Sequence, residues 1–202
     1  MLDAPLRKLI DPVLARAAKP MAAAGLGANM VTLAGAVAAL VALASIMEEH
    51  YLLGLALIVL NRILDGLDGA VARLTKATDL GAYLDIALDF IFYGGVPFAF
   101  ALADPGRALA ASFLIFSFIA TGSTFLAFAV FAARRGIETD ARGRKSLYYQ
   151  GGLTEGTETF IAFAVACIWP DWFGIVAYVF GTLCFVTAGM RVGEAVQSLR
   201  PS

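Results

Sequence analysis

Four aspartates occupy some of the most apolar stretches of the chain and span 25 residues: Asp65, Asp68, Asp85 and Asp89. An ionised aspartate near the middle of a bilayer costs roughly 2.5–3.5 kcal/mol, so four without partners would cost on the order of 10 kcal/mol. The turn that separates the two pairs offers only one arginine and one lysine. Divalent cations are the natural partners for the remaining charge, so the cluster predicts a metal site at a membrane.

The spacing within each pair favours ligands on one helix face. Asp65 and Asp68 are three residues apart, and Asp85 and Asp89 are four apart, so each pair shares a side of its helix. Oxygen ligands without histidine or cysteine favour Mg²⁺ or Mn²⁺ over zinc. A pair of such cations suits displacement at phosphorus, because they neutralise phosphate oxygens and stabilise the attacking and leaving groups. The cluster therefore predicts two cations and phosphoryl chemistry.

The elements that must position these aspartates are membrane helices. The 202 residues are 60% hydrophobic, against roughly 45–50% in soluble domains. We expect an all-α integral membrane protein, a single domain over 1–202 with a six-helix transmembrane bundle over 29–195. The apolar runs place these helices at 30–47, 51–64, 80–103, 108–133, 154–169 and 172–190.

A different pattern precedes the first run. Residues 1–26 have apolar side chains every three to four positions, with basic residues between them. This is typical of an amphipathic helix lying in the membrane interface; a plain cytoplasmic lead-in is the alternative. Alternate loops are basic, which by the positive-inside rule places both termini and the aspartate-rich turn on the cytoplasmic side of the cell (inner) membrane.

The aspartates also carry a resemblance to a known family. Their pattern is D-x2-D-G-x2-A-R-x7-G-x3-D-x3-D, which resembles the signature of the CDP-alcohol phosphotransferases, membrane enzymes that make phospholipids. Eight positions at fixed spacing make this a specific signal, and six helices behind an amphipathic segment are also what that family has.

The resemblance implies roles for individual residues. Asp65 and Asp85 would bridge both metals, Asp68 would complete the first, and Asp89 would complete the second and act as general base. Three further residues would contact the cytidine diphosphate: Gly69, Arg73 and Thr78.

A shorter match lies at the start of the first membrane helix. Asn29 and Thr32 resemble the Asn-x-x-Thr of many members, which touches the nucleotide, although Ala28 stands where a proline is common. The alternative for Asn29 is an ordinary helix cap.

The resemblance implies transfer of a phosphatidyl group from CDP-diacylglycerol to an acceptor hydroxyl, with release of CMP. The basic side chains in the second half suit a phosphorylated acceptor such as inositol phosphate or glycerol phosphate; orientation charge with anionic-lipid contact is the alternative. These candidate acceptor residues are Arg134, Arg135, Lys145 and Arg191. Glu155 and Glu158 instead favour a cationic headgroup, or a pairing with Arg191.

Other readings stay open. Within the family, a CDP-choline/ethanolamine-type enzyme or a serine- or choline-accepting enzyme is the alternative. Outside it, a cation-coupled transporter also keeps acidic residues in membrane helices, and a non-catalytic lipid-binding scaffold can share the fold. The resemblance implies a homodimer, which is common in that family, and the Gly- and Ala-rich helices permit close helix–helix contact. We expect no nucleic-acid partner.

Overall fold

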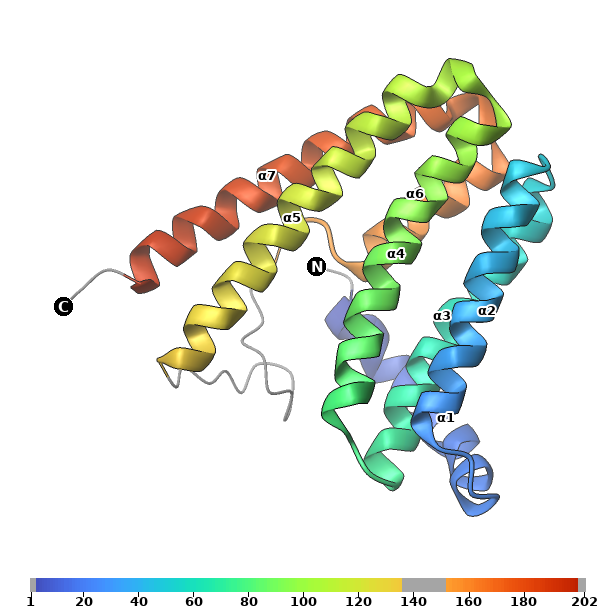
Figure 1. Cartoon of the computed structure of the whole chain (residues 1–202), viewed down its shortest axis with the longest axis vertical. Coiled ribbons are helices and arrows are strands. Elements are labelled where there is room, and N and C mark those ends of the chain that lie inside the picture. Colours follow the sequence, from blue (N-terminus) through green and yellow to red (C-terminus); the bar gives the residue numbers. More distant parts are fainter. Residues whose placement is uncertain (1–2, 136–151, 200–202) are drawn as a thin grey trace.

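The computed structural model describes residues 3–135 and 152–199, which form an all-helical structure with no strand among them (Figure 1). The described residues form seven α-helices. Two short 3₁₀ turns, η1 (Pro105–Arg107) and η2 (Pro170–Trp172), directly precede the fifth and the seventh of them. The helices are α1 (Asp3–Ala23), α2 (Ala28–Met47), α3 (Tyr51–Leu74), α4 (Asp79–Ala103), α5 (Ala108–Arg134), α6 (Gly156–Ile168) and α7 (Phe173–Leu199). The predicted all-α membrane fold is thus confirmed.

Helix α2 packs against both α3 and α4, the two helices that carry the aspartate motif. The buried face of α2 is built from small residues, among them Gly35, Ala38 and Ala42, which let neighbouring backbones approach closely. The Asn61 amide of α3 donates to the Gly35 carbonyl of α2 at 2.9 Å. Small side chains and this hydrogen bond therefore hold α2 and α3 in a fixed register.

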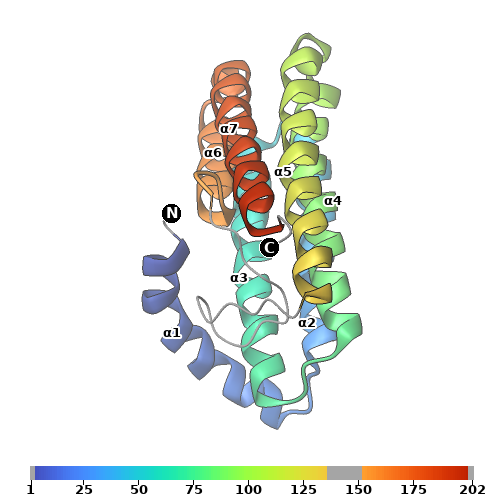
Figure 2. The ribbon, with the colours of Figure 1, turned by 90° about the vertical axis from the view of Figure 1, so that its left-hand side faces the viewer.

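Helices α5 and α7 form a second pair that runs obliquely to the first group, and α6 lies between α3 and α7 (Figures 1 and 2). Aromatic side chains fill the junction: Phe92 meets Phe163 edge to face at 6.0 Å, and Phe100 stacks on Phe173 at 4.5 Å. This core anchors α4, whose first turns carry two of the four aspartates.

By length and hydropathy alone, four helical stretches of the described residues are suited to cross a membrane: 28–47, 79–103, 105–134 and 170–199. The helix α3 is 24 residues long but includes Arg62, Asp65, Asp68 and Arg73, and α6 has only 13 residues. The chain is a membrane protein, and the count of six spans stays a prediction.

Two helices extend beyond their apolar runs. The second apolar run ends at residue 64, and the spacing of Asp65 and Asp68 predicted a helix that continues past it; α3 does continue, through the motif to Leu74. The last helix likewise extends past residue 190 to Leu199. In both cases the extra turns are polar helix that hydropathy does not detect.

The amphipathic character predicted for residues 1–26 agrees with α1, which packs obliquely against α3 (Figure 2). One side of α1 lies against the bundle through Leu14, Ala18 and Met21. Another side exposes Leu9 and Val13, at 75% and 63% of their surfaces. The exposed apolar side is what a helix in the membrane interface presents to lipid.

Candidate metal centre

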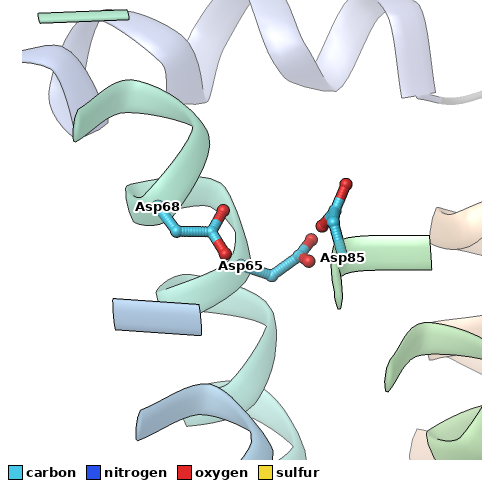
Figure 3. Close-up of side chains that lie close together, drawn as sticks. All are labelled: Asp65, Asp68 and Asp85. Carbon is cyan, nitrogen blue, oxygen red and sulfur yellow. The ribbon is translucent and has the colours of Figure 1, made fainter. Parts of the chain in front are cut away.

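The structure brings three of the four motif aspartates together. Asp65 and Asp68 project from α3 and Asp85 from the second turn of α4, and one carboxylate oxygen of each lies within 4.8 Å of the others. The carboxylates of Asp65 and Asp85 face each other between the two helices, with Asp68 one turn further along α3 (Figure 3). Three close carboxylates repel one another, so this arrangement requires positive charge.

Asp89 does not belong to this three-residue group, but it lines the same cavity of about 260 Å³. Its carboxylate accepts a hydrogen bond at 2.7 Å from Arg62 of α3 and forms an ion pair with it. The same guanidinium lies 3.7 Å from a carboxylate oxygen of Asp65, which follows Arg62 by about one turn of α3. Arg62 therefore links the fourth aspartate to the other three.

Asp68 is the most deeply placed of the four, with 7% of its surface exposed. The Thr32 hydroxyl of α2 donates to its carboxylate at 2.6 Å. Thr32 itself is buried, so this hydrogen bond joins α2 to the face of α3 that carries the motif aspartates.

The donor set fits a hard divalent cation. All the candidate ligands are carboxylate oxygens, close enough to share an ion, and no histidine or cysteine joins the group among the described residues. Mg²⁺ and Mn²⁺ prefer such ligands. The aspartates that would hold a first cation are Asp65, Asp68 and Asp85.

Two of the predicted nucleotide-binding residues lie next to each other at the start of α4. A Cβ on Gly81 would lie 2.9 Å from Asn29 Oδ1 and 3.2 Å from Thr78 Oγ1. Thr78 caps α4, because its hydroxyl accepts from the Gly81 amide at 3.1 Å. The absence of a side chain at Gly81 is what allows Asn29 of α2 to approach this helix end.

Asn29 does not cap α2, which was the alternative to its predicted contact with the nucleotide. The N-cap of α2 is Gly27, with no side-chain capping bond. The motif residues Gly69 and Arg73 lie on one side of α3, because a Cβ on Gly69 would lie 3.5 Å from a guanidinium nitrogen of Arg73. Arg73 is exposed, so its charge is available to a ligand.

The candidate acceptor residues occupy different surroundings. Arg134 and Arg135 are exposed at the end of α5, where Arg135 donates to the Leu199 carbonyl at 2.9 Å and joins the ends of α5 and α7. Arg191 is buried, and it donates to the Thr121 carbonyl of α5 at 3.0 Å. Lys145 lies outside the described residues.

Glu155 and Glu158 have a local structural role. They form a capping box at the start of α6, in which each side chain accepts from the backbone amide of the other residue. This arrangement satisfies two amides that the first turn of a helix leaves without partners. The pattern Glu-x-x-Glu before an apolar run is a signal that the sequence analysis did not use.

Arg62 and Asn61 are the site residues that sequence analysis missed. The sequence analysis assigned Arg62 no role in the site, although it lies three residues before Asp65, a spacing that brings side chains together on a helix. Its pairing with Asp89 depends on how α3 packs against α4, which the sequence does not specify.

Comparisons with known proteins agree with this geometry. The family model for CDP-alcohol phosphatidyltransferase matches residues 26–188. The chain is 46% identical over 201 residues to the inner membrane protein YnjF of Escherichia coli, covering 99% of this chain and 98% of that protein. It is 45% identical over 64 residues to archaetidylinositol phosphate synthase of Aeropyrum pernix, covering 31% of this chain and 33% of that one.

The fold is also that of a solved structure. Phosphatidylinositol phosphate synthase of Mycobacterium tuberculosis, in a crystal structure with CDP-DAG bound, superimposes with a TM-score of 0.75 at 20% sequence identity. The match covers 95% of this chain and 98% of that one.

Proposed function

The chain belongs to the CDP-alcohol phosphatidyltransferase family and is a transferase of substituted phosphate groups, and on that premise we propose that it transfers the phosphatidyl group of CDP-diacylglycerol to an acceptor hydroxyl and releases CMP. The observation that carries the proposal is the convergence of Asp65, Asp68 and Asp85 within 4.8 Å at one end of two membrane helices. A lipid donor can reach such a site from the bilayer with its acyl chains left in lipid.

The cytidine diphosphate binds beside the aspartates in this proposal. Arg73 supplies charge-assisted hydrogen bonds to a phosphate oxygen, and Gly69 next to it leaves room for the ligand. Asn29 and Thr78, which meet at Gly81, lie where α2 and α4 begin and contact the nucleotide. Thr32 orients Asp68 through its 2.6 Å hydrogen bond.

When bound, two Mg²⁺ or Mn²⁺ ions would neutralise the diphosphate and stabilise the charge of the leaving CMP. As the resemblance implies, Asp65 and Asp85 would contribute to holding both ions, Asp68 to holding the first and Asp89 to holding the second. Asp89 also takes the proton of the acceptor hydroxyl, which then attacks the phosphorus next to the diacylglycerol. The bond from that phosphorus to the CMP oxygen breaks.

For the acceptor we propose a phosphorylated polyol, such as inositol phosphate or glycerol phosphate. Arg191 supports this proposal because it places a buried guanidinium against α5, and the capping box of Glu155 and Glu158 keeps those carboxylates in a local structural role. Arg134, Arg135 and Lys145 would contribute further positive charge at the same side of the membrane.

The experiment is an acceptor panel. The purified protein is incubated with CDP-diacylglycerol, Mg²⁺ and one acceptor at a time, and CMP release is followed. We expect release with a phosphorylated polyol and none without a divalent cation. If CMP is released with serine or choline but not with a phosphorylated polyol, the acceptor proposal is refuted. If no acceptor leads to CMP release, phosphatidyl transfer itself is refuted.

Arg191→Ala tests the acceptor site separately. We expect the KM for a phosphorylated acceptor to rise at least tenfold, equivalent to about 1.4 kcal/mol, while the KM for the donor stays unchanged. Unchanged acceptor kinetics would point to an uncharged or cationic acceptor.

The proposed arrangement in the cell is a homodimer in the inner membrane, with both termini and the active site in the cytoplasm. The name of the Escherichia coli relative, an inner membrane protein, supports the membrane placement, and the predominance of basic residues in alternate loops supports the orientation. Labelling of single cysteines introduced at Lys76 and at Glu49 from each side of the membrane tests the orientation. The cysteine at position 76 should react only with reagent on the cytoplasmic side of the membrane. The cysteine at position 49 should react only with reagent on the opposite side.

A further inference from the structure

We propose that Arg62 is a built-in counter-cation for Asp89, which positions this carboxylate and keeps the second cation from binding until the donor arrives. The inference rests on the proposed function, because it concerns how the same aspartates divide their charge between protein and metal.

The first support is the geometry around the guanidinium. Arg62 donates to Asp89 Oδ1 at 2.7 Å and to Asn61 Oδ1 at 2.7 and 3.0 Å from two of its nitrogens. A third nitrogen donates to the Tyr93 hydroxyl at 3.2 Å. The guanidinium therefore uses all three of its nitrogens within this group.

The second support is how firmly this group is fixed. Asn61 is 6% exposed and donates to the Gly35 carbonyl of α2 at 2.9 Å. The Phe92 ring of α4 lies 4.9 Å from the Arg62 guanidinium carbon, a distance at which a cation is attracted to an aromatic face. Because α2, α3 and α4 all contribute, Arg62 is placed as precisely as the helices themselves.

The third support is the charge balance. Asp65, Asp68, Asp85 and Asp89 carry four negative charges and Arg62 one positive charge, a sum of −3. One divalent cation leaves −1, where the four aspartates alone would leave −2, and a second cation brings the site to an excess of +1. Arg62 thus halves the charge that attracts the second ion. The two negative charges of the donor diphosphate reverse this balance. Arg62 therefore ties binding of the second cation to binding of the donor.

The alternative is that Arg62 only neutralises a partly buried aspartate and stabilises the fold. The two roles differ in what happens to cation affinity when the charge is removed. A structural residue would leave the affinity of a folded variant unchanged, whereas a counter-cation competes with the metal for the same carboxylates, so its removal strengthens metal binding.

The test is a titration of the purified full-length protein with Mn²⁺ alone, followed by electron paramagnetic resonance without donor or acceptor. We expect Arg62→Gln to bind Mn²⁺ about tenfold more tightly than wild type, equivalent to about 1.4 kcal/mol. Arg62→Lys, which keeps the charge, should stay close to wild type. Lys76→Gln makes the same change of net charge at an exposed residue of the α3–α4 turn and is the matched control.

Kinetics supply a second readout. Both Arg62→Gln and Arg62→Lys should lower kcat for CMP release about tenfold with little change in the KM for the donor, since neither side chain can hold Asp89 at 2.7 Å while also bonding to Asn61 and Tyr93. If Arg62→Gln alone fails to fold, Asp89→Asn is compared with the double variant Arg62→Gln/Asp89→Asn. The double variant should bind Mn²⁺ about threefold more tightly than Asp89→Asn, because Arg62 also lies 3.7 Å from Asp65; the gain is smaller than for Arg62→Gln because the contact with Asp89 is already gone.

Each outcome decides between the claims. Equal Mn²⁺ affinities of Arg62→Gln and Lys76→Gln, or of Asp89→Asn and the double variant, would overturn the role of Arg62 and leave the proposed transferase intact. If wild type and all variants bind no Mn²⁺ with or without CDP-diacylglycerol, the metal-dependent function itself fails.

Discussion

The Thr32 hydroxyl of α2 lies 2.6 Å from a carboxylate oxygen of Asp68 on α3, and both residues are buried. A hydrogen bond to a charged group contributes about 1.5–3 kcal/mol, and this one fixes the orientation of a candidate metal ligand. It also connects the Asn-x-x-Thr segment to the aspartate motif, two parts of the sequence that are 36 residues apart.

Replacement of this hydroxyl is the first prediction. Thr32→Val keeps the side-chain shape but leaves the Asp68 carboxylate without its donor, so we expect Mn²⁺ affinity and kcat/KM to fall about tenfold. Thr32→Ser retains the hydroxyl and should stay within about threefold of wild type in both measurements. Equal behaviour of the valine and serine variants would show that the hydrogen bond does not orient the ligand.

The second prediction concerns the three close carboxylates. Asp85→Asn removes one charged oxygen ligand, and we expect Mn²⁺ binding to be lost together with at least about a thousandfold of kcat/KM, or about 4 kcal/mol. Asp79→Asn is the matched control, because Asp79 lies in the first turn of the same helix outside the motif. Similar losses in both variants would argue against a specific ligand role for Asp85.

The third prediction separates proton transfer from binding. Asp89→Asn should lower kcat at least about a hundredfold, the usual minimum for loss of a general base, while CMP affinity stays within about threefold of wild type. Turnover is measured as CMP release and binding by calorimetry with CMP. Wild-type turnover in Asp89→Asn would remove this residue from the proton-transfer role.

The fourth prediction uses two glycines of α4. A Cβ on Gly81 would lie 2.9 Å from Asn29 Oδ1, whereas a Cβ on Gly94 would meet nothing within 4 Å. Gly81→Ala should displace the Asn29 side chain and raise the KM for CDP-diacylglycerol about tenfold. Gly94→Ala should leave the KM unchanged and raise helix stability by up to about 1 kcal/mol.

Thermal unfolding in detergent, followed by circular dichroism, checks that both glycine variants fold. A rise in KM for Gly94→Ala as large as for Gly81→Ala would mean that the effect comes from the helix backbone and not from Asn29.

Much of the fold could be predicted from the sequence because long apolar runs leave the backbone few alternatives in lipid. The observed bounds of α2, α4 and α5 lie within two residues of the predicted ones. The apolar run does not mark the end of α3, since its last ten residues include the charged motif and hydropathy reports side chains rather than backbone conformation.

The grouping of Asp65, Asp68 and Asp85 could also be anticipated, because three- and four-residue spacings fix which side of a helix a residue occupies. The partner of Asp89 could not. Arg62 and Asp89 are 27 residues apart, and their pairing depends on how α2 holds α3 beside α4, with Arg62 over the Phe92 and Tyr93 rings.

Helix α1 lies against the part of α3 that carries two of the motif aspartates. A Cβ on Gly66, the residue after the first motif aspartate, would lie 2.6 Å from a methyl group of Leu14, so the N-terminal helix rests directly on the backbone that carries the ligands. A shift of that helix in depth or tilt, caused by anionic lipids or by a thinner bilayer, would be passed to the reacting groups. Under the proposed function, lipid composition would in this way tune turnover without any contact to the substrates.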